Sequence, residues 1–504
     1  MIKDIFVKKN PYSLLKESEL SKTKLKRVLS KWDLIAFGVG SVVGAGIFTV
    51  IGTAAAGTVD SAGNVLRIGS GPGLIISFII AGLVCSFSTL CYAEFSSLIP
   101  ISGSAYTYAY ATLGEIVAWI IGWDLVLEYC VAVIAVSISW SAYAVGLLKE
   151  FGMELPIWLS LDYNTFHNKI SSDPSLLEKV PVVFGHLVSV NFPAIFIVAI
   201  ITIILVIGIR ESSLINTIMV MVKMTILVFF IVIGIFFIKP VNFHLPEYGF
   251  FPFGWSGVMT GGALIFFAYI GFDAITTVAE ETKNPEKALP YGIISSMIIT
   301  TIIYIAVAVV LLGIVPFYEL RRADPIAYAF DYIKIGWASG LVSIGALIAT
   351  TSVILVTLLG QTRIFFSIAR DGLIPSTFSK VHPRFKTPYI STIITGAFVM
   401  IVAGFIDIGE AAELTNIGTL FAFAIVCLGV IVLRIKEPNR PRPFKTPFFP
   451  YIPILGIISC MYLSFNLPAL TWYRFILWFI AGMFIYLFYG YKNSGARRNN
   501  LKNE

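Results

Sequence analysis

Residues 38–48 read GVGSVVGAGIF and place four glycines within nine residues of an apolar segment. Glycine costs roughly 1 kcal/mol relative to alanine inside a helix, so such a cluster marks either a close crossing of two helices or a point where one helix opens. Gly40 and Gly44 have the GxxxG spacing that on its own favours a crossing. A second interrupted segment, GGALIFFAYIGFD at residues 261–273, shifts the balance towards opened helices.

The composition places both segments in a membrane. Of the 504 residues, 57% are hydrophobic and 13% are charged, whereas a soluble domain has a hydrophobic share near half. A bilayer core about 30 Å thick is crossed by roughly 20 apolar helical residues. We therefore predict an all-α integral membrane protein with about twelve transmembrane helices, at residues 33–57, 73–99, 114–148, 189–209, 213–238, 255–280, 291–315, 338–368, 388–405, 411–433, 451–467 and 472–490.

The two interrupted segments fall in the first and the sixth predicted spans, five spans apart. This pairing is typical of an inverted repeat of five plus five helices with a site near the bilayer midplane. We expect the first repeat at residues 33–238, the second at 255–433, and helices 11 and 12 at 451–490. Where a helix opens, free N–H groups attract a carboxylate and free C=O groups attract an ammonium. A zwitterionic amino acid carries both groups.

Basic residues are concentrated near the N-terminus, because residues 1–32 hold nine of the 36 lysines and arginines. Loops rich in these residues stay on the cytoplasmic side, so we expect cytoplasmic tails at 1–32 and 491–504. The basic residues then anchor the topology, and no nucleic-acid partner is expected. The sequence has no N-x-S/T sequon, which fits a multi-pass protein of the bacterial inner membrane.

A set of short motifs is highly specific when taken together. They are GAGIF at 44–48, CYAEF at 91–95, SGSAYTY at 102–108, GWDLVLEY at 122–129, Lys223, FAYIGFD at 267–273 and EETKNP at 280–285. On these residues the chain resembles the amino acid–polyamine–organocation superfamily, and more closely its bacterial cationic amino acid transporter family. The resemblance covers nearly the whole chain.

The resemblance implies a leucine-transporter-type fold in which helices one and six are unwound around the substrate. The substrate carboxylate would meet the backbone amides of Ala45 and Gly46, and its ammonium would meet the carbonyls of Phe267, Ala268 and Ile270. Phe267 would also act as an aromatic gate. Many relatives have threonine where this chain has Ala45, so a hydroxyl contact is missing here, but backbone binding should survive that loss.

Lys223 lies about eleven residues into the predicted fifth span, or about 16 Å deep at 1.5 Å per residue. Its side chain is too short to reach either surface, and burial disfavours its charged form. It can therefore gain and lose a proton, unless carbonyls or a carboxylate keep it permanently charged. The resemblance implies an amine where sodium-coupled relatives hold a second sodium. We predict proton coupling through Lys223, in contact with carbonyls of the opened first span and with hydroxyls such as Thr351 or Ser352.

Glu128 is a second charge near the middle of the bilayer, and its role is open at this stage. The resemblance implies that it reaches the substrate side chain, which would let the protein accept arginine, lysine or ornithine. Alternatively, it is a structural acid held by hydroxyls, or a second proton carrier. Asp273, Glu94 and Asp124 are less decisive, because each also fits the role of a capping or packing acid near a cytoplasmic end or within the bundle.

Glu280 and Glu281 end the predicted sixth span close to Lys283 and Lys287. A cytoplasmic gate and a solvated helix end have the same pattern here, so the sequence does not separate them.

Other classes of protein lack support in the sequence. There is no HExxH motif, no P-loop and no cysteine–histidine cluster, so we expect no enzyme, cofactor or metal site. We expect a monomer, surrounded by lipid, that carries cationic or small neutral L-amino acids together with protons. An amino acid exchanger, or a nutrient receptor that keeps the binding site without transport, are the alternatives.

Overall fold

A computed structural model describes residues 27, 29–59, 65–101, 103–172, 180–183, 186–207, 212–322, 324–385, 387–495 and 497. Most of the predicted N-terminal tail, the end of the predicted C-terminal tail and Ser102 of the SGSAYTY motif lie outside these residues.

Within the described residues, nine helical segments are long and apolar enough to cross a membrane. They are Lys31–Ala56, Gly71–Leu98, Glu115–Lys149, Ile215–Phe237, Gly254–Thr277, Pro285–Ile314, Gly336–Arg370, Ile408–Lys436 and Ala469–Asn493. Three shorter apolar helices coincide with the remaining predicted spans: Phe192–Ile207, Tyr389–Ala403 and Tyr451–Phe465. The predicted fold class is confirmed, whereas the boundaries of the two repeats remain a prediction.

The individual elements follow one another along the chain with short connections. The main helices are α5 (Leu74–Leu98), α7 (Glu115–Glu150), α10 (Phe192–Ile207), α11 (Ser212–Gly234), α14 (Pro285–Ile314), α16 (Gly336–Arg370), α17 (Tyr389–Ala403), α18 (Ile408–Lys436), α19 (Tyr451–Phe465) and α20 (Ala469–Ile485). Shorter helices are α6 (Ser104–Thr112), α8 (Ile157–Ser160), α9 (Tyr163–Ser172), α15 (Pro325–Tyr332) and α21 (Tyr491–Asn493). Two small hairpins pair β1 (Thr58–Val59) with β2 (Val65–Arg67) and β3 (Val182–Val183) with β4 (His186–Leu187).

The first span is interrupted where the glycines cluster. Helix α3 (Lys31–Val42) is followed by Val43, whose backbone is extended (φ −77°, ψ 99°). The chain resumes as the wide helical turn η1 (Gly46–Val50), which continues into α4 (Ile51–Ala56). The cluster therefore marks an opened helix, as the pairing of interruptions predicts.

The sixth span is interrupted in the same manner. Helix α12 (Gly254–Ile265) tightens into η6 (Phe266–Tyr269), the backbone becomes extended at Ile270, and Gly271 adopts φ +119°. A short helix, α13 (Ala274–Thr277), completes the span. A φ of this sign is open to glycine at little cost but strained for other residues, so Gly271 permits the turn.

The two broken helices pack against each other in opposite directions. A Cβ added at Gly46 would meet Ala268, Ser41 bonds to Gly271, and a Cβ added at Gly38 would meet Ile275. The residue numbers fall from 46 to 38 along the first span while those of their partners in the sixth span rise from 268 to 275, so the two segments are antiparallel. The breaks therefore lie beside each other, as an inverted repeat requires.

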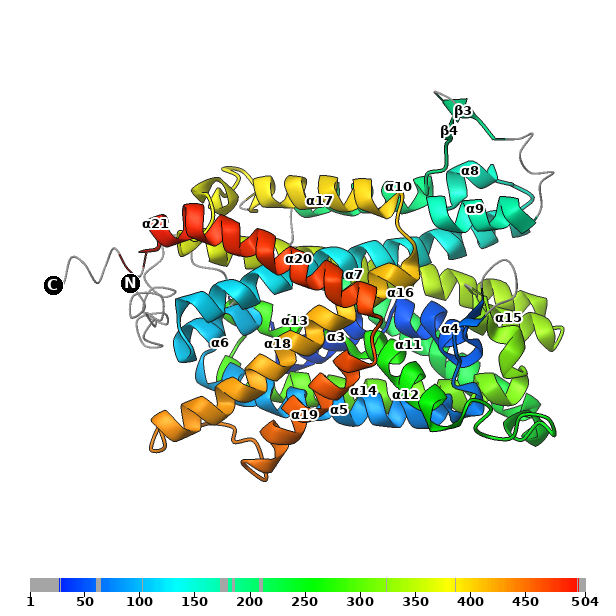
Figure 1. Ribbon diagram of the computed structural model, residues 1–504, viewed down its shortest axis with the longest axis horizontal. Helices are drawn as coiled ribbons and strands as arrows, with labels where there is room; N and C mark the ends of the chain where they lie inside the picture. Colours follow the sequence, from blue (N-terminus) through cyan, green and yellow to red (C-terminus); the bar gives the residue numbers. More distant parts are fainter. Residues whose placement is uncertain are drawn as a thin grey trace.

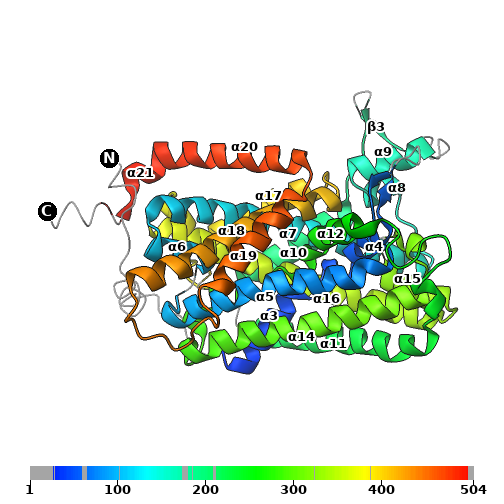
Figure 2. The same ribbon diagram turned by 60° about the horizontal axis from the view of Figure 1, so that its bottom comes forward.

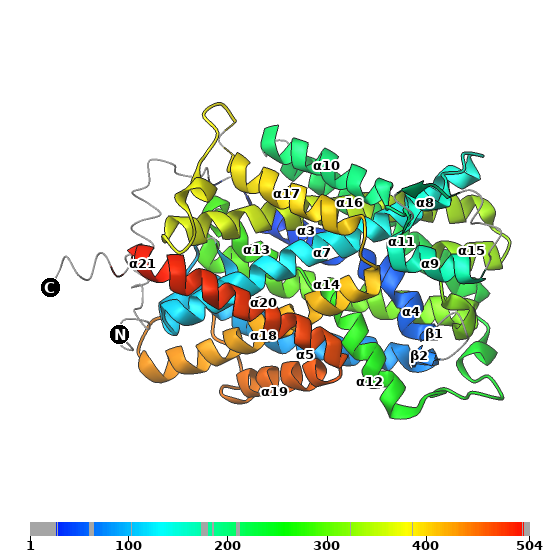
Figure 3. The same ribbon diagram turned by 45° about the horizontal axis from the view of Figure 1, so that its top comes forward.

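The other helices surround this pair. Figure 1 shows α3 and α13 within the bundle, with α7 and α16 crossing beside them. Helix α20 runs along the outside of the bundle in Figure 2, and α10 and α17 form a pair on another outer face in Figure 3. Helices α6 and α21 lie at one end of the molecule, and α4, α8, α9 and α15 lie at the other.

The close approach of the breaks predicts the effect of Gly46→Ala. The new methyl group would lie 2.3 Å from Ala268 Cα and 2.9 Å from Ala268 N, and backbone atoms cannot move aside as a side chain does. Overpacking of this kind typically costs about 1–3 kcal/mol, so thermal unfolding in detergent should occur at a lower temperature. Gly146→Ala is the matched control, because nothing lies within 4 Å of its new Cβ. Equal unfolding temperatures for the two variants would contradict the packing.

Candidate functional site

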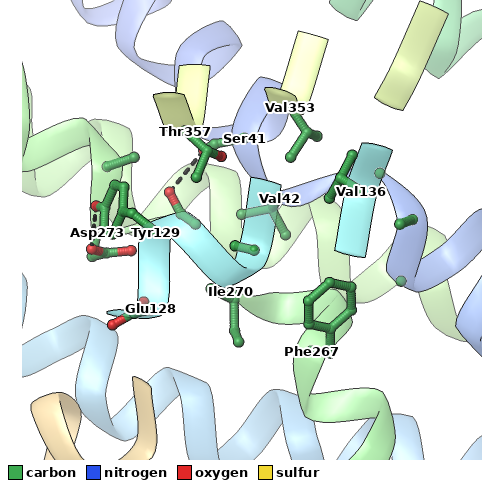
Figure 4. A pocket seen from close by; sticks show the side chains of 16 residues that line it. Ser41, Val42, Glu128, Tyr129, Val136, Phe267, Ile270, Asp273, Val353 and Thr357 are labelled. Atoms are coloured by element: carbon green, nitrogen blue, oxygen red, sulfur yellow. Dashed lines mark hydrogen bonds between the residues drawn. The ribbon is translucent and has the colours of Figure 1, made fainter. Parts of the chain in front are cut away.

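A small cavity of about 40 Å³ lies between the two broken helices and the long helices α7 and α16. Sixteen residues line it: Ser41, Val42, Gly44, Ala45 and Gly46 from the first span, Glu128, Tyr129, Ala132 and Val136 from α7, Phe267, Ile270, Gly271, Asp273 and Ala274 from the sixth span, and Val353 and Thr357 from α16. In Figure 4 the acidic residues Glu128 and Asp273 face one side of the cavity and Phe267 another.

The first span contributes a helix start to the cavity. Ala45 precedes η1, Gly46 is its first residue, and both residues line the cavity. The first N–H groups of a helix have no partner within that helix and carry a partial positive charge. This edge of the cavity is therefore suited to an anionic group such as a carboxylate.

The sixth span contributes a helix end. The last carbonyl groups of a helix lack internal partners and carry partial negative charge. Phe267 and Ile270 line the cavity at this point, but Ala268 does not: it packs against Gly46 instead. Five of the six predicted substrate-binding residues thus surround one space, and Ala268 lies behind it.

Several carbonyls that the breaks release are bonded to side chains of the bundle. Ser41 Oγ donates to the Gly271 carbonyl at 2.7 Å and so ties the two broken helices together. Tyr304 OH donates to the Val42 carbonyl at 2.9 Å, and the Tyr143 hydroxyl donates to the carbonyl of Phe48. These bonds hold the opened backbone in one conformation.

Lys223, on α11, holds the rear of the first break. It is fully buried, and its Nζ donates to the carbonyl of Gly40 at 2.6 Å and to that of Val43 at 2.7 Å. It does not line the cavity, whereas Val42 and Gly44, on either side of Val43, do. Lys223 therefore contacts one side of a backbone segment whose other side faces the cavity.

The prediction that Lys223 contacts the hydroxyl of Thr351 or Ser352 is wrong for the described part of the chain. Ser352 Oγ donates to Asn216 Oδ1 at 2.8 Å. Thr351 Oγ1 donates to the Leu347 carbonyl at 2.6 Å and accepts from Trp140 Nε1 at 3.0 Å. Both hydroxyls thus have other partners, and the expected carbonyl contacts alone are found.

An acidic wall closes one side of the cavity. Tyr129 OH donates to Asp273 Oδ2 at 2.8 Å, joining α7 to the sixth span. Glu128 Oε2 and Asp273 Oδ1 have no hydrogen-bond partner among the described residues. Burying a carboxyl oxygen without a partner is costly, so these atoms are ready to bind a donor that enters the cavity.

Asp124 lies one turn before Glu128 on α7 but does not line the cavity. It is fully buried, and its Oδ1 would lie 3.0 Å from a Cβ added at Gly418 of α18. Neither of its oxygens bonds to a described residue. It does not contact the cavity, so it lacks the position for direct contact with a bound molecule.

Two other acids from the sequence have structural partners at the end of the bundle that holds α6. Glu94 accepts two bonds from Arg434, at 2.9 and 2.6 Å, and one from Thr446 N at 2.8 Å. Glu281 pairs with Arg363 of α16 at 2.5 Å. Glu94 therefore anchors α5 to α18, and Glu281 joins the end of the sixth span to α16.

The sequence did not single out Ser41, Tyr129, Val353 or Thr357. Ser41 lies in the glycine-rich segment and Tyr129 lies beside Glu128. Nothing in the sequence indicates a role for either hydroxyl. Val353 and Thr357 belong to a long apolar helix, in which nothing marks the two residues that face the cavity.

Known membrane proteins are similar to this chain over most of its length. A family model described as amino acid permease matches residues 29–495. The chain is 42% identical over 487 residues to a methylthioribose transporter of Bacillus subtilis, covering 97% of this chain and 98% of that protein. It is also 42% identical over 491 residues to the branched-chain amino acid permease BcaP of the same species, with 97% and 98% covered.

A plant relative is more distant. The chain is 39% identical over 419 residues to the vacuolar cationic amino acid transporter 4 of Arabidopsis thaliana, covering 82% of this chain and 64% of that protein. These relatives are named as transporters or permeases, which agrees with the expectation that the chain is not an enzyme.

The link between the broken helices predicts the effect of Ser41→Ala. Loss of the bond to Gly271 removes about 1 kcal/mol of net stabilisation, so backbone amides at 42–48 and 270–275 should exchange hydrogen roughly fivefold faster. Thr53→Val is the matched control, because Thr53 bonds only within its own segment, to Val50 O at 3.0 Å. Unchanged exchange in Ser41→Ala, or an equal change in the control, would refute the link.

Proposed function

This chain belongs to the amino acid permease family of the amino acid–polyamine–organocation superfamily, and we propose that it carries L-amino acids across a cell membrane together with protons. The observation that carries the proposal is the position of Lys223, which bonds the rear of the same backbone segment whose front lines the cavity. Substrate and a titratable group would then act on one backbone segment.

The two ends of the cavity fit the two charged groups of an amino acid. The carboxylate would lie at the start of η1, by the amides of Ala45 and Gly46, where the helix terminus is positive. The ammonium would lie by the carbonyls at the end of η6, near Phe267 and Ile270. These contacts use backbone atoms alone, so they are the same for every amino acid and leave the choice of side chain to the rest of the cavity.

The remaining walls favour two classes of side chain. The Oε2 of Glu128, which has no hydrogen-bond partner among the described residues, fits the cationic end of arginine, lysine or ornithine. Val136, Ile270 and Val353 instead provide apolar walls that fit small neutral or branched side chains, as in the relative named as a branched-chain permease. We propose small neutral and cationic L-amino acids as the substrates, and methylthioribose belongs in the test panel because a relative is named for it.

Lys223 supplies the proposed coupling. A protonated ammonium has three donors and holds the carbonyls of Gly40 and Val43 at once. No carboxylate among the described residues pairs with Lys223, and burial disfavours the charged form. Release of the proton would weaken its bonds to the carbonyls of Gly40 and Val43. Proton binding would thus stabilise the backbone conformation that receives substrate, and proton loss would favour its release.

The orientation is part of the same proposal. The concentration of basic residues in the N-terminal segment supports an orientation in which the end of the molecule that holds α6 and α21 lies in the cytoplasm and the opposite end faces outward. Inward movement of protons would then drive uptake. A single copy of the chain encloses the cavity, so we propose a monomer as the transporting unit.

The first test is uptake of labelled alanine, leucine and arginine into proteoliposomes under an inward proton gradient, with sodium absent. Wild-type protein should accumulate substrate, and Lys223→Met should lose gradient-driven accumulation at least tenfold, because methionine offers no donor to Gly40 and Val43 and cannot bind a proton. Lys149→Met is the matched control, since Lys149 lies exposed at the end of α7 and should keep full uptake.

Other outcomes would overturn the coupling. Accumulation that requires sodium, or that persists in Lys223→Met, excludes a proton site at Lys223. Uptake only against a preloaded amino acid would make the chain an exchanger, and saturable binding without any uptake would make it a receptor.

Glu128→Gln tests the choice of side chain. If Glu128 meets a cationic side chain, the variant should bind arginine at least tenfold more weakly while its affinity for alanine stays within about twofold. Competition with labelled alanine in detergent measures both affinities without requiring transport. Equal loss for the two substrates would instead assign Glu128 to the structure or to proton transfer.

A further inference from the structure

Three lysines surround a second cavity, at the junction where α3 and α14 begin. Lys31, Lys283 and Lys287 line it together with Ser30, Asn284 and Tyr291, and the space measures about 440 Å³. It shares no lining residue with the cavity between the broken helices. The proposed transport cycle gives this cavity no role.

The positive charge of this cavity is not neutralised within the part of the chain that the structure describes. None of the three lysines forms an ion pair with a residue in that part, and two of the neighbouring acids are bonded elsewhere. Asp33 accepts from Ser30 N at 2.8 Å and from Ser30 Oγ at 2.7 Å, and Glu281 pairs with Arg363. Glu286, in the first turn of α14, does not line the cavity.

Two helices begin beside the lysines. Helix α3 begins at Lys31, and the 30-residue helix α14 begins at Pro285, directly after Asn284 of the cavity wall. The start of α3 is capped by Ser30 and Asp33, and the first turn of α14 holds Glu286. The positive charge offered to an anion therefore comes from the three lysine ammonium groups.

Aromatic rings place the cavity at the level of lipid headgroups. Trp32 is 64% exposed and Tyr291 is 45% exposed, and their rings meet edge to face with centroids 6.4 Å apart. Lys31 Nζ lies 5.2 Å and 5.3 Å from the two ring centres. Exposed tryptophan and tyrosine of membrane proteins gather at the interface between water and hydrocarbon.

An apolar stripe continues from the cavity into the membrane. Ile298 and Ile302 are 55% and 63% exposed, and they lie seven and eleven residues after Tyr291 on α14, which puts all three on one face. A free phosphate would use none of this stripe. A lipid would use both parts, with its headgroup among the lysines and an acyl chain along the helix.

We propose that this cavity binds the headgroup of an anionic phospholipid. The headgroup would bridge Lys31 at the start of α3 and Lys283 in the loop before α14. The backbone already joins these two segments, because Leu29 N donates to Glu281 O at 3.0 Å and Lys283 N donates to Leu29 O at 2.9 Å. A bound lipid would therefore strengthen the contact between the start of the first broken helix and the end of the sixth span.

The test counts lipids on the full chain, in nanodiscs of phosphatidylcholine with a small share of phosphatidylglycerol, by native mass spectrometry. We expect each of Lys31→Gln, Lys283→Gln and Lys287→Gln to weaken phosphatidylglycerol association about fivefold, and the triple variant to lose one bound phosphatidylglycerol per protein. The matched control combines Lys380→Gln, Arg384→Gln and Lys436→Gln, three exposed residues at the same end of the molecule, and should keep that lipid.

Three results would overturn the proposal. These are retention of the lipid by the triple variant, equal loss in the control, and displacement of the lipid by inorganic phosphate at millimolar concentration, which would identify a free-anion site. All three lysines are exposed, so folding should survive, and the single variants carry the test if the triple variant does not fold. None of these outcomes depends on proton coupling or on the transported amino acid.

Discussion

The structure depends on one constraint: a backbone group freed inside the bilayer core has no water to bond to, so it needs a partner in the protein or in a ligand. Opening the first and sixth spans frees several such groups at once. Lys223 bonds the carbonyls of Gly40 and Val43, Tyr304 that of Val42, and Ser41 that of Gly271. In the proposed function, the groups facing the cavity, at the start of η1 and the end of η6, are the ones that a substrate would bind.

This distribution of partners explains why a lysine stands in the middle of a membrane helix. A neutral side chain with one donor would satisfy one of the two carbonyls and leave the other with an unmet demand of about 1–3 kcal/mol. An ammonium satisfies both, and in the proposed mechanism its charge would make the break sensitive to protons. The same side chain thus serves folding and, in the proposed mechanism, coupling, while Gly46 and Gly271 provide the space and the backbone angle that bring the breaks together.

The sequence predicts the long elements well, because apolar runs of bilayer length and paired glycine-rich interruptions occur in few other kinds of fold. It also predicts that Lys223 and Glu128 lie deep in the membrane, where a charged residue has few purely structural roles. It does not reveal that Ser352 bonds Asn216 rather than Lys223, or that Ala268 packs behind the cavity. Those details depend on how helices far apart in the sequence rotate against each other, and a single sequence carries no signal for that rotation. Helix α6, between the second and third spans, was not predicted, because its small and aromatic residues resemble those of a connecting segment.

The most direct measurement of the central claim is the proton movement that accompanies substrate. Protein is reconstituted into liposomes that contain a pH-sensitive dye, with equal pH on both sides, no sodium and a potassium–valinomycin clamp of the membrane potential. Addition of external alanine to wild-type protein should acidify the lumen in step with entry of labelled alanine, because each substrate enters with Lys223 protonated. Entry of labelled alanine without any change in internal pH would contradict the account, since substrate would then cross the membrane without a proton.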